Sequence, residues 1–216
     1  MAKAGRFSKK AKTAAAARHG MRERILDAAM SLMSEKGMDA VSMREISGHV
    51  RVTKPVLYYY FKDKDDLCCQ MFARTLKGAD VFTTELETGN LPALAAVTRL
   101  FEGTFRLMRC KPDFARLVHR EMSNPRACSK FARMIIVMRE RMVRILGCVL
   151  DKAEAAGEIP PGSSRDVLYL IDAVQGSFMR MACCDELRRQ DAGLPARLAA
   201  MIIAGAKTRG KERKSC

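Results

Sequence analysis

The sequence of 216 residues has no uninterrupted apolar stretch of the roughly 18 to 20 residues that a membrane-spanning helix needs. The N-terminus also lacks the continuous apolar segment and cleavage site of a secretory signal peptide. We therefore expect a cytoplasmic protein with no membrane partner. The balance of 48% hydrophobic and 29% charged residues is that of a folded globular chain rather than a disordered one.

Sequence motifs of common enzyme and metal sites are missing as well. There is no Gly-rich phosphate loop, no His-Glu-x-x-His and no nucleophile with an obvious base partner. The eight cysteines form no Cys-x-x-Cys pair, and the adjacent pairs 68–69 and 183–184 fall in helical patterns, where neighbouring side chains point about 100° apart. We expect no enzyme, no cofactor and no metal. The cysteines are interpreted as small hydrophobic residues, with a thiol or metal sensor as the alternative.

No segment of convincing length shows the alternation of apolar and polar residues that indicates a β-strand. Apolar residues recur at helical spacing instead, as at Ile25, Ala29 and Leu32. The pattern predicts an all-α fold with about nine helices, approximately over residues 22–36, 43–50, 54–61, 65–89, 91–110, 112–122, 125–157, 164–184 and 195–207.

The positive charge is concentrated at the two ends of the chain. Lys and Arg number 39 against 24 Asp and Glu, a net charge of +15. Residues 1–24 hold eight basic side chains and one acidic, and residues 207–216 hold five and one. Because both ends also lack apolar periodicity, we expect a flexible basic arm at 1–20 and a basic tail at 208–216. They are suited to a polyanion such as nucleic acid, or serve only solubility.

Two short helices with start signals follow the first helix. Ser42 can cap the first of them, with Glu45 completing a capping box. Thr53 can cap the second, with Pro55 in its first turn. Two short capped helices joined by a tight turn, with a preceding helix to cover them, are the arrangement of a helix-turn-helix DNA reader.

The residues of this region resemble the N-terminal domain of TetR-family transcriptional regulators. The resemblance spans about 45 residues and is carried by RILDAA, EKG, VSMREI and VTKPVLYYYFKDKDDL, at 24–29, 35–37, 41–46 and 52–67. It implies a three-helix helix-turn-helix DNA-binding domain followed by a helical effector-binding and dimerisation domain. We place these at residues 21–67 and 68–207.

The expected DNA contacts lie on the two short helices and just after them. Thr53 and Lys54 stand at the end that a recognition helix presents to base edges. Three consecutive tyrosines project in three directions, so they cannot all be buried. A tyrosine can donate to a phosphate or lay its ring against a thymine methyl. The expected set is Ser42, Arg44, Thr53, Lys54, Pro55, Tyr58, Tyr59, Tyr60 and Lys64.

The resemblance implies particular roles within this set. Tyr58 and Tyr60 would touch the DNA backbone, Tyr59 would face the groove, and Lys64 would contact a phosphate. Ser42 serves as a cap, a phosphate ligand or both.

Two features depart from the family pattern. Arg51 stands in the turn between the two short helices, where the family usually has glycine. A left-handed backbone there would cost an arginine roughly 1 kcal/mol, so either the turn differs or the strain is tolerated, with a phosphate contact as one reason. The arm before the first helix is longer and more basic than the motif needs, which suggests a minor-groove or backbone contact.

The last two helices are more apolar than one buried face requires. The first of them begins with a second capping box, Ser163 with Asp166. Paired with a second copy they would form a four-helix interface, and the homodimer would read a palindromic operator in double-stranded DNA. The expected interface residues are Leu168, Ile171, Val174, Leu198, Met201 and Ile202.

The helices between the two ends carry many Met and Phe residues. Methionine adapts to ligands of varied shape, so fifteen methionines favour a small hydrophobic effector, although such a stripe also suits a plain core. We predict a repressor that the effector releases from its operator; the alternative is a ligand-independent DNA-binding or architectural protein. The candidate effector residues are Phe101, Phe105, Met108, His119, Met122, Met138, Met142 and Phe178.

Overall fold

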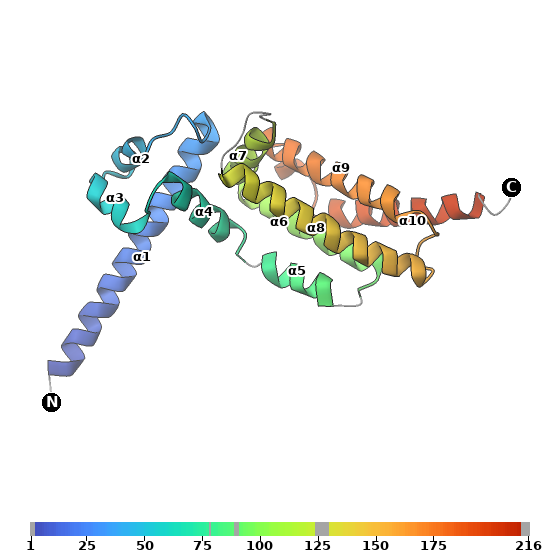
Figure 1. Ribbon diagram of the computed structural model, residues 1–216, viewed down its shortest axis with the longest axis horizontal. Helices are drawn as coiled ribbons and strands as arrows, with labels where there is room; N and C mark the ends of the chain where they lie inside the picture. The colour runs from blue at the N-terminus through green and yellow to red at the C-terminus, as the bar shows by residue number, and fades with distance from the viewer. Residues whose placement is uncertain (1–2, 78, 89–90, 124–129, 213–216) are drawn as a thin grey trace. The chain divides into compact units, whose positions relative to one another are not determined.

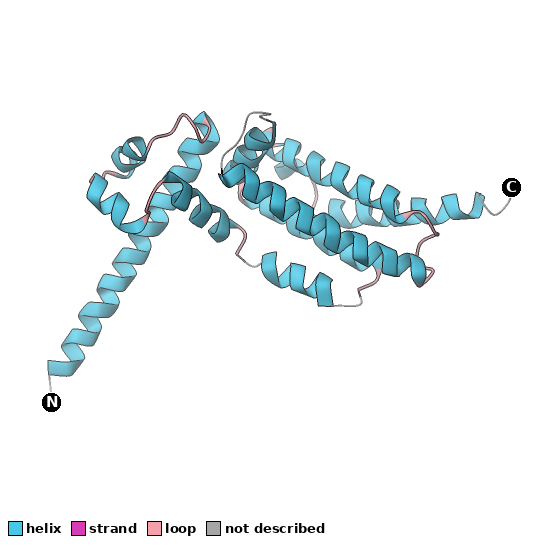
Figure 2. Cartoon of the chain, in the orientation of Figure 1, coloured by secondary structure: helices cyan, strands magenta, loops and turns pink. Residues whose placement is uncertain are grey.

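A computed structural model describes residues 3–77, 79–88, 91–123 and 130–212, with the side chains of residues 20–77, 83–87, 91–123 and 130–208. Over these residues the chain forms ten α-helices and one short 3₁₀ helix, without a strand (Figures 1 and 2). The predicted all-α fold is confirmed. In the same residues no helix combines the length and the apolar character needed to cross a bilayer. The side chains expected to form most of the basic arm and tail lie outside the described residues.

The chain divides into two compact units, residues 1–74 and 75–216. The first contains α1 (Lys3–Lys36), α2 (Met43–Val50), α3 (Lys54–Tyr60) and α4 (Lys64–Thr75), although the last residue of α4 falls in the second unit. In this unit α2 packs against both α1 and α3. Its core consists of side chains less than 2% exposed: Ile25, Leu26, Ala29, Met33, Val41, Ile46, Leu57, Phe61, Leu67, Cys68 and Met71.

Helix α4 is joined to α1 by polar contacts as well as by the core. The guanidinium of Arg22 donates to Gln70 Oε1 from Nη2 at 2.6 Å. Arg74 reaches back to two carboxylates of α1, at 2.9 Å from Glu23 and 2.8 Å from Asp27. These contacts join α4 to residues 22–27 of α1.

The second unit contains α5 (Ala79–Thr88), α6 (Ala93–Cys110), α7 (Pro112–Ser123), α8 (Lys130–Ala155), α9 (Ser164–Cys183), η1 (Glu186–Arg189) and α10 (Leu194–Glu212). Helix α9 contacts α6, α7, α8 and α10, and α5 lies along α8. At its centre the Phe178 ring meets the Phe101 and Phe105 rings edge to face, with centroids 5.8 and 5.5 Å apart. Each such ring pair adds about 0.5 to 1.5 kcal/mol beyond the buried area.

Two predicted helix boundaries are wrong. The single helix expected over 65–89 is divided into α4 and α5, and Gly78 stands between them in the sequence. Glycine costs about 1 kcal/mol relative to alanine inside a helix, so the apolar pattern alone overestimated its length. Helix α1 begins at Lys3 rather than near Arg22. Residues 14–17 are four alanines, which favour a helix without any apolar periodicity.

The predicted capping box at the start of α9 is also wrong. The Ser163 hydroxyl donates to Pro160 O at 2.5 Å and makes no capping bond. Glu154, near the end of α8, instead accepts from the backbone N–H groups of Gly162, at 2.9 Å, and Ser164. Hydrogen bonding to Ser164 and Gly162 holds the pKa of the Glu154 carboxyl below its ordinary value. A distant carboxylate therefore performs the task that the sequence assigned to a local side chain.

We predict that Glu154→Ala lowers the free energy of unfolding by about 1 kcal/mol, because the first turn of α9 loses its acceptor. Urea denaturation of the full chain measures this change. Because the pKa of Glu154 is lowered in the folded state, its stabilisation is present at neutral pH and is lost as the pH falls below the ordinary carboxyl range. The difference in the free energy of unfolding between wild type and Glu154→Ala should therefore become smaller in acid.

The matched control is Asp166→Ala, which removes a carboxylate from the first turn of the same helix. It should cost clearly less than Glu154→Ala. Equal losses in the two variants, or a larger loss in Asp166→Ala, would contradict the cap by Glu154.

Candidate nucleic-acid interface

Helix α2 begins at the predicted cap. Ser42 Oγ accepts from the Glu45 backbone N–H at 3.1 Å, which confirms the cap. The Glu45 carboxylate binds Lys36 Nζ, at the end of α1, at 2.5 Å. Hydrogen bonding to Lys36 is the main cause that lowers the pKa of Glu45, and a hydrogen bond from the Ser42 backbone N–H, the reciprocal half of the capping box, lowers it further. Ser42 is exposed and uses its oxygen only as an acceptor there, so its hydroxyl proton remains available to an external acceptor.

The turn after α2 has the backbone conformation expected of a glycine. Arg51 has φ 60° and ψ 46°, in the left-handed region. Its N–H donates to Gly48 O at 3.1 Å, and the Val52 N–H donates to Ser47 O at 2.9 Å. These bonds satisfy carbonyl groups at the end of α2. The turn therefore keeps the conformation that suits glycine although the residue is arginine. The left-handed backbone of Arg51 lowers the stability of the fold by roughly 1 kcal/mol.

Helix α3 has seven residues and buries only Leu57 among them, with Phe61 buried directly after its end. The Tyr58 side chain is 51% exposed and that of Tyr59 67% exposed. Tyr60 is half-buried, with its ring edge-on to Tyr59 at 5.1 Å. The expectation that the three tyrosines cannot all be buried is confirmed, and Leu57 with Phe61 holds the helix while two tyrosines face solvent.

Thr53 occupies the position before α3 but does not cap it, contrary to the prediction. A capping side chain accepts from the second or third N–H of the helix, and Pro55, near the start of α3, has no N–H to donate. Within the described residues the Thr53 hydroxyl has no hydrogen-bond partner. Thr53, Lys54 and Pro55 are all exposed.

Lys64 differs from the other candidate contacts. It is half-buried, and its Nζ donates to Met38 O at 2.7 Å and Val41 O at 3.1 Å. Two of its three ammonium protons are thus used inside the unit, to hold the connection that leads into α2. The structure gives Lys64 a positioning role that the sequence did not indicate, and its phosphate contact stays a prediction.

The nearest carboxylates after α3 are engaged within the unit. Asp63 Oδ1 accepts from the Asp66 N–H at 2.7 Å, and Asp66 Oδ2 accepts from the Lys62 N–H at 2.9 Å. Asp63 thus caps α4, and Asp66 binds the backbone of the residue before that cap. Neither bond was predicted, because the sequence pattern sought was Ser or Thr followed by Glu or Gln. Hydrogen bonds from Gln70 and Lys62 keep the pKa of Asp66 low.

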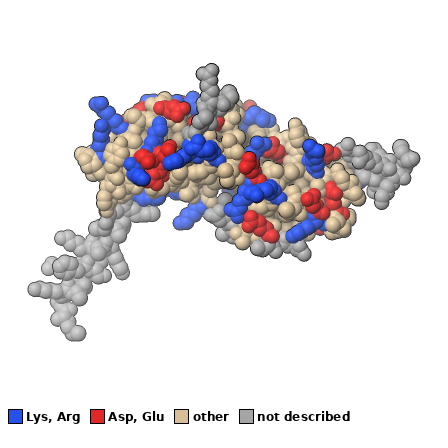
Figure 3. Space-filling model, viewed as in Figure 1, with Lys and Arg blue, Asp and Glu red and all other residues tan. Residues whose placement is uncertain are grey.

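Three basic side chains on or beside α2 and α3 form no ion pair within the described residues. Arg44, Arg51 and Lys54 are exposed, and each lacks an acidic partner within the part of the chain that the structure describes. Basic and acidic side chains are interspersed over the face shown in Figure 3. A preference for polyanions in the first unit therefore depends on this local set rather than on a uniformly basic surface.

The candidate effector residues do not converge on one opening. Phe101, Phe105, Met108 and Phe178 are buried, with three of the rings packed on one another. Met122 and Met138 are exposed, and His119 and Met142 are half-buried.

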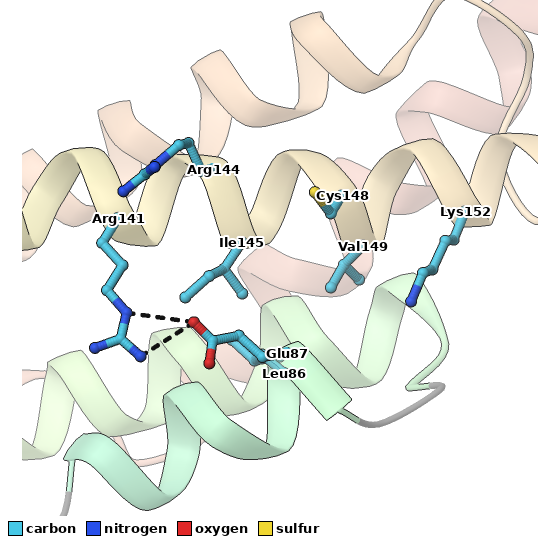
Figure 4. A pocket seen from close by; sticks show the side chains of 8 residues that line it. All are labelled: Leu86, Glu87, Arg141, Arg144, Ile145, Cys148, Val149 and Lys152. Atoms are coloured by element: carbon cyan, nitrogen blue, oxygen red, sulfur yellow. Dashed lines mark hydrogen bonds and ion pairs between the residues drawn. The ribbon is translucent and has the colours of Figure 1, made fainter.

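A groove between α5 and α8 contains none of these eight residues. It has a volume of about 340 Å³ and is lined by Leu86, Glu87, Arg141, Arg144, Ile145, Cys148, Val149 and Lys152. Ile145 and Val149 point from α8 toward α5, with Arg141 and Lys152 on either side of them (Figure 4). The signal in the sequence was the helical spacing of basic and apolar residues along α8, which resembles an ordinary solvated face.

The charges of the groove are not balanced. Glu87 Oε1 accepts from Arg141 Nε and Nη2, at 3.3 and 3.1 Å (Figure 4). Arg144 and Lys152 have no acidic partner among the described side chains. The groove therefore combines an apolar floor with an excess of positive charge, which suits an amphipathic anion.

The cysteines are predicted to be small hydrophobic residues, and among the six that the structure describes Cys68 is fully buried. Its Sγ lies 3.8 Å from the Met33 sulfur in the core. Cys110, Cys148 and Cys184 are exposed, because a helical pattern does not reveal which face a neighbouring helix covers. Burial raises the pKa of the Cys183 thiol, which makes it less reactive.

The predicted dimer residues are mixed in exposure. Ile171 is buried inside the unit, Leu168, Val174, Leu198 and Ile202 are half-buried, and Met201 is 69% exposed. Two apolar residues of α9 that were not predicted for the interface are exposed as well, Tyr169 at 80% and Leu170 at 48%. Large exposed apolar side chains on α9 and α10 are the available surface for a partner.

The first unit thus has the helix-turn-helix arrangement that is typical of DNA-binding domains, and its short helix α3 exposes two tyrosines. The family model for bacterial regulatory proteins of the tetR family matches residues 25–70. The transcriptional regulator AcrR of Shigella flexneri is 36% identical over 66 residues, which are 31% of this chain and 30% of AcrR. The predicted resemblance is confirmed for residues 25–70, which match the N-terminal domain of TetR-family regulators. The chain matches less than a third of the length of this relative, and the likeness is limited to that domain.

Solved structures show that the fold of most of the chain is shared. The TetR-family regulator PfmR of Thermus thermophilus has a TM-score of 0.65 at 19% identity, over 84% of this chain and 95% of PfmR. The regulator FadR of Bacillus subtilis, solved with stearoyl-CoA, has a TM-score of 0.62 at 18% identity, over 85% of this chain and 98% of FadR. At these identities the likeness establishes the fold.

We predict that Lys64→Ala lowers the free energy of unfolding by about 1 to 2 kcal/mol, because two charge-assisted hydrogen bonds are lost. Lys54→Ala, at an exposed lysine without a partner, should change it by less than about 0.5 kcal/mol. Urea denaturation of both variants tests this difference. A Lys64→Ala variant as stable as wild type would show that the two carbonyl contacts contribute nothing.

Proposed function

We propose that the protein is a sequence-specific transcriptional regulator that binds a palindromic operator in double-stranded DNA as a homodimer. The observation that carries the proposal is the exposure of Tyr58 and Tyr59 on the short helix α3, beside Thr53 and Lys54. Tyr59 is 67% exposed, so most of its ring is accessible to a DNA groove. The match of residues 25–70 to the TetR N-terminal domain supports this assignment. The proposal requires no catalytic reaction, cofactor or metal.

The contacts divide into two kinds. Ser42 and Arg44, at the start of α2, are suited to phosphates, because the first helix of this motif crosses the DNA backbone. Thr53, Lys54 and Tyr59 are suited to base edges or thymine methyl groups in the major groove. Pro55, Tyr58 and Tyr60 complete the surface next to them, with the tyrosine hydroxyls directed to the backbone by analogy with the family.

The homodimer would form through α9 and α10. Tyr169, Leu170 and Met201 expose apolar surface on these helices. Two copies of the pair would bury this surface in a four-helix interface, and a two-fold dimer would space its recognition helices for two half-sites.

We further propose that the regulator is a repressor, and that a small hydrophobic effector with an acidic group releases it from DNA. The groove between α5 and α8 supports an effector of this class, because Arg144 and Lys152 would meet the acidic group and Ile145 with Val149 the apolar chain. The neighbour FadR was solved with stearoyl-CoA, a molecule of this chemistry. An effector that binds a conformation with altered spacing of the recognition helices would shift the population away from DNA.

For the DNA contacts, we predict that Tyr59→Ala weakens binding about 5- to 100-fold on the duplex that wild type selects from a random-sequence pool. Because the side chain is largely exposed, the unfolding midpoint should not change. Tyr59→Phe is the matched control that keeps the ring and tests the hydroxyl. If Tyr59→Ala unfolds the domain, the ring is a packing residue and its assigned role is wrong.

For Lys54, the expected signature is a loss of sequence preference. Lys54→Ala should weaken binding to the selected duplex more than binding to a random duplex, and Lys111→Ala, at an exposed lysine of the second unit, should leave the ratio of the two affinities unchanged. Equal weakening on both duplexes would mean that Lys54 contributes only charge. Failure of wild type to select any duplex would overturn the proposed function.

For the effector, stearate and stearoyl-CoA are expected to lower the affinity for the selected duplex. In the double variant Arg144→Gln, Lys152→Gln, release from the duplex should need about tenfold more of either compound. Without the compounds, the double variant should bind DNA with the wild-type affinity. Arg165→Gln, at an exposed arginine of α9, serves as the control. If neither these two compounds nor a wider panel of hydrophobic acids changes DNA binding, the protein is a ligand-independent DNA-binding protein.

A further inference from the structure

Arg51 holds a backbone conformation that an arginine has no local reason to adopt. Among the described residues other than glycine, only Arg51 and Asp185 have positive φ, at 60° and 56°. Aspartate tolerates this region because its short side chain can bond locally, and Asp185 also lies 3.9 Å from Arg188. Arginine has no such short polar group. The two residues share a conformation, and only Asp185 has a local explanation for it.

The side chain of Arg51 does not compensate for the strain within the free protein. It is exposed and makes no hydrogen bond or ion pair within the described part of the chain. Glu45, a carboxylate of the preceding helix, is already bound to Lys36 at 2.5 Å. Glycine at this position would keep the same turn, because the bonds that close it use only backbone atoms. The arginine thus lowers the stability of the fold, and no contact of its side chain within the described residues offsets this loss.

The position of Arg51 in the motif indicates what the side chain is for. The residue stands between α2, whose start presents Ser42 and Arg44, and α3, which presents Lys54 and Tyr59. In a helix-turn-helix complex the first helix crosses the phosphate backbone beside the groove that the second helix enters. A guanidinium in the connecting turn is near that backbone, and its planar fork can bind two phosphate oxygens at once.

We propose that Arg51 binds a phosphate beside the bases that α3 reads, and that this contact is the reason an arginine occupies a position where glycine would be more stable. The inference rests on the proposed function, since it requires that α2 and α3 dock on DNA. It adds to the domain a phosphate ligand that the glycine-containing turn of the family does not provide. Strain at a functional turn is a known way of keeping a side chain where its partner needs it.

Substitution at Arg51 can separate strain from charge. Arg51→Gly removes both and should raise or maintain the unfolding midpoint while weakening binding to the selected duplex about tenfold. Arg51→Ala removes the charge and keeps the strain, so it should bind as weakly as Arg51→Gly and be less stable. Arg51→Lys keeps both but loses the fork, and it should lose only two- to threefold in affinity.

The salt dependence identifies the contact as a phosphate. The slope of log affinity against log salt should fall by about one unit in Arg51→Gly and Arg51→Ala, and stay near the wild-type value in Arg51→Lys. Asp185→Gly is the matched control, because it changes the other left-handed residue outside the helix-turn-helix domain, and it should leave DNA affinity unchanged.

The outcomes distinguish this inference from the function on which it rests. If wild type selects no duplex, the proposed function fails. If wild type selects one and Arg51→Gly binds it with the same affinity and salt slope, only the role of Arg51 is overturned. A lower unfolding midpoint for Arg51→Gly than for wild type would overturn the strain argument, and with it the inference.

Discussion

The helix-turn-helix surface depends on the burial of two side chains, Leu57 and Phe61. Helix α3 has seven residues, and an isolated helix of this length is not stable in water. It exists because Leu57, on its inner face, and Phe61, directly after its end, are at most 1% exposed in the core with Ile25, Ile46 and Leu67. Burial of each of these large side chains is worth about 1.5 to 3 kcal/mol. Only with that anchorage can the rest of the helix leave its polar and aromatic side chains in solvent.

The electrostatics of this surface follow from how its carboxylates are used. Glu45 is bound to Lys36, and Asp63 and Asp66 satisfy N–H groups at the start of α4. The acidic groups are thereby engaged in maintaining the fold, while Arg44, Arg51 and Lys54 are exposed without such partners in the described structure. The basic side chains that remain without an acidic partner are therefore the ones open to an external anion.

Much of the first unit was predictable because its signals are local. The Ser42 cap, Pro55 and the run of three tyrosines are read from neighbours in the sequence, and the structure confirms the cap and the exposure of Tyr58 and Tyr59. Signals that depend on distant residues were missed. Glu154 caps α9 from the preceding helix, and Lys64 binds the carbonyls of Met38 and Val41 more than twenty residues away. In the second unit the aromatic residues expected around an effector pack on one another, because periodicity identifies a buried face without showing whether it encloses a space.

The sequence by itself determined the helical class, the helix-turn-helix motif and the residues on its reading helix. These properties can be read from helical periodicity and from local signals such as the Ser42 cap, Pro55 and the run of three tyrosines. The tertiary structure alone decided which polar side chains were already engaged, that Arg51 holds a left-handed turn, and that a basic groove lies between α5 and α8. The physical reason is that hydrogen bonds, ion pairs and cavities join groups far apart in the chain, and their partners are set by packing rather than by spacing.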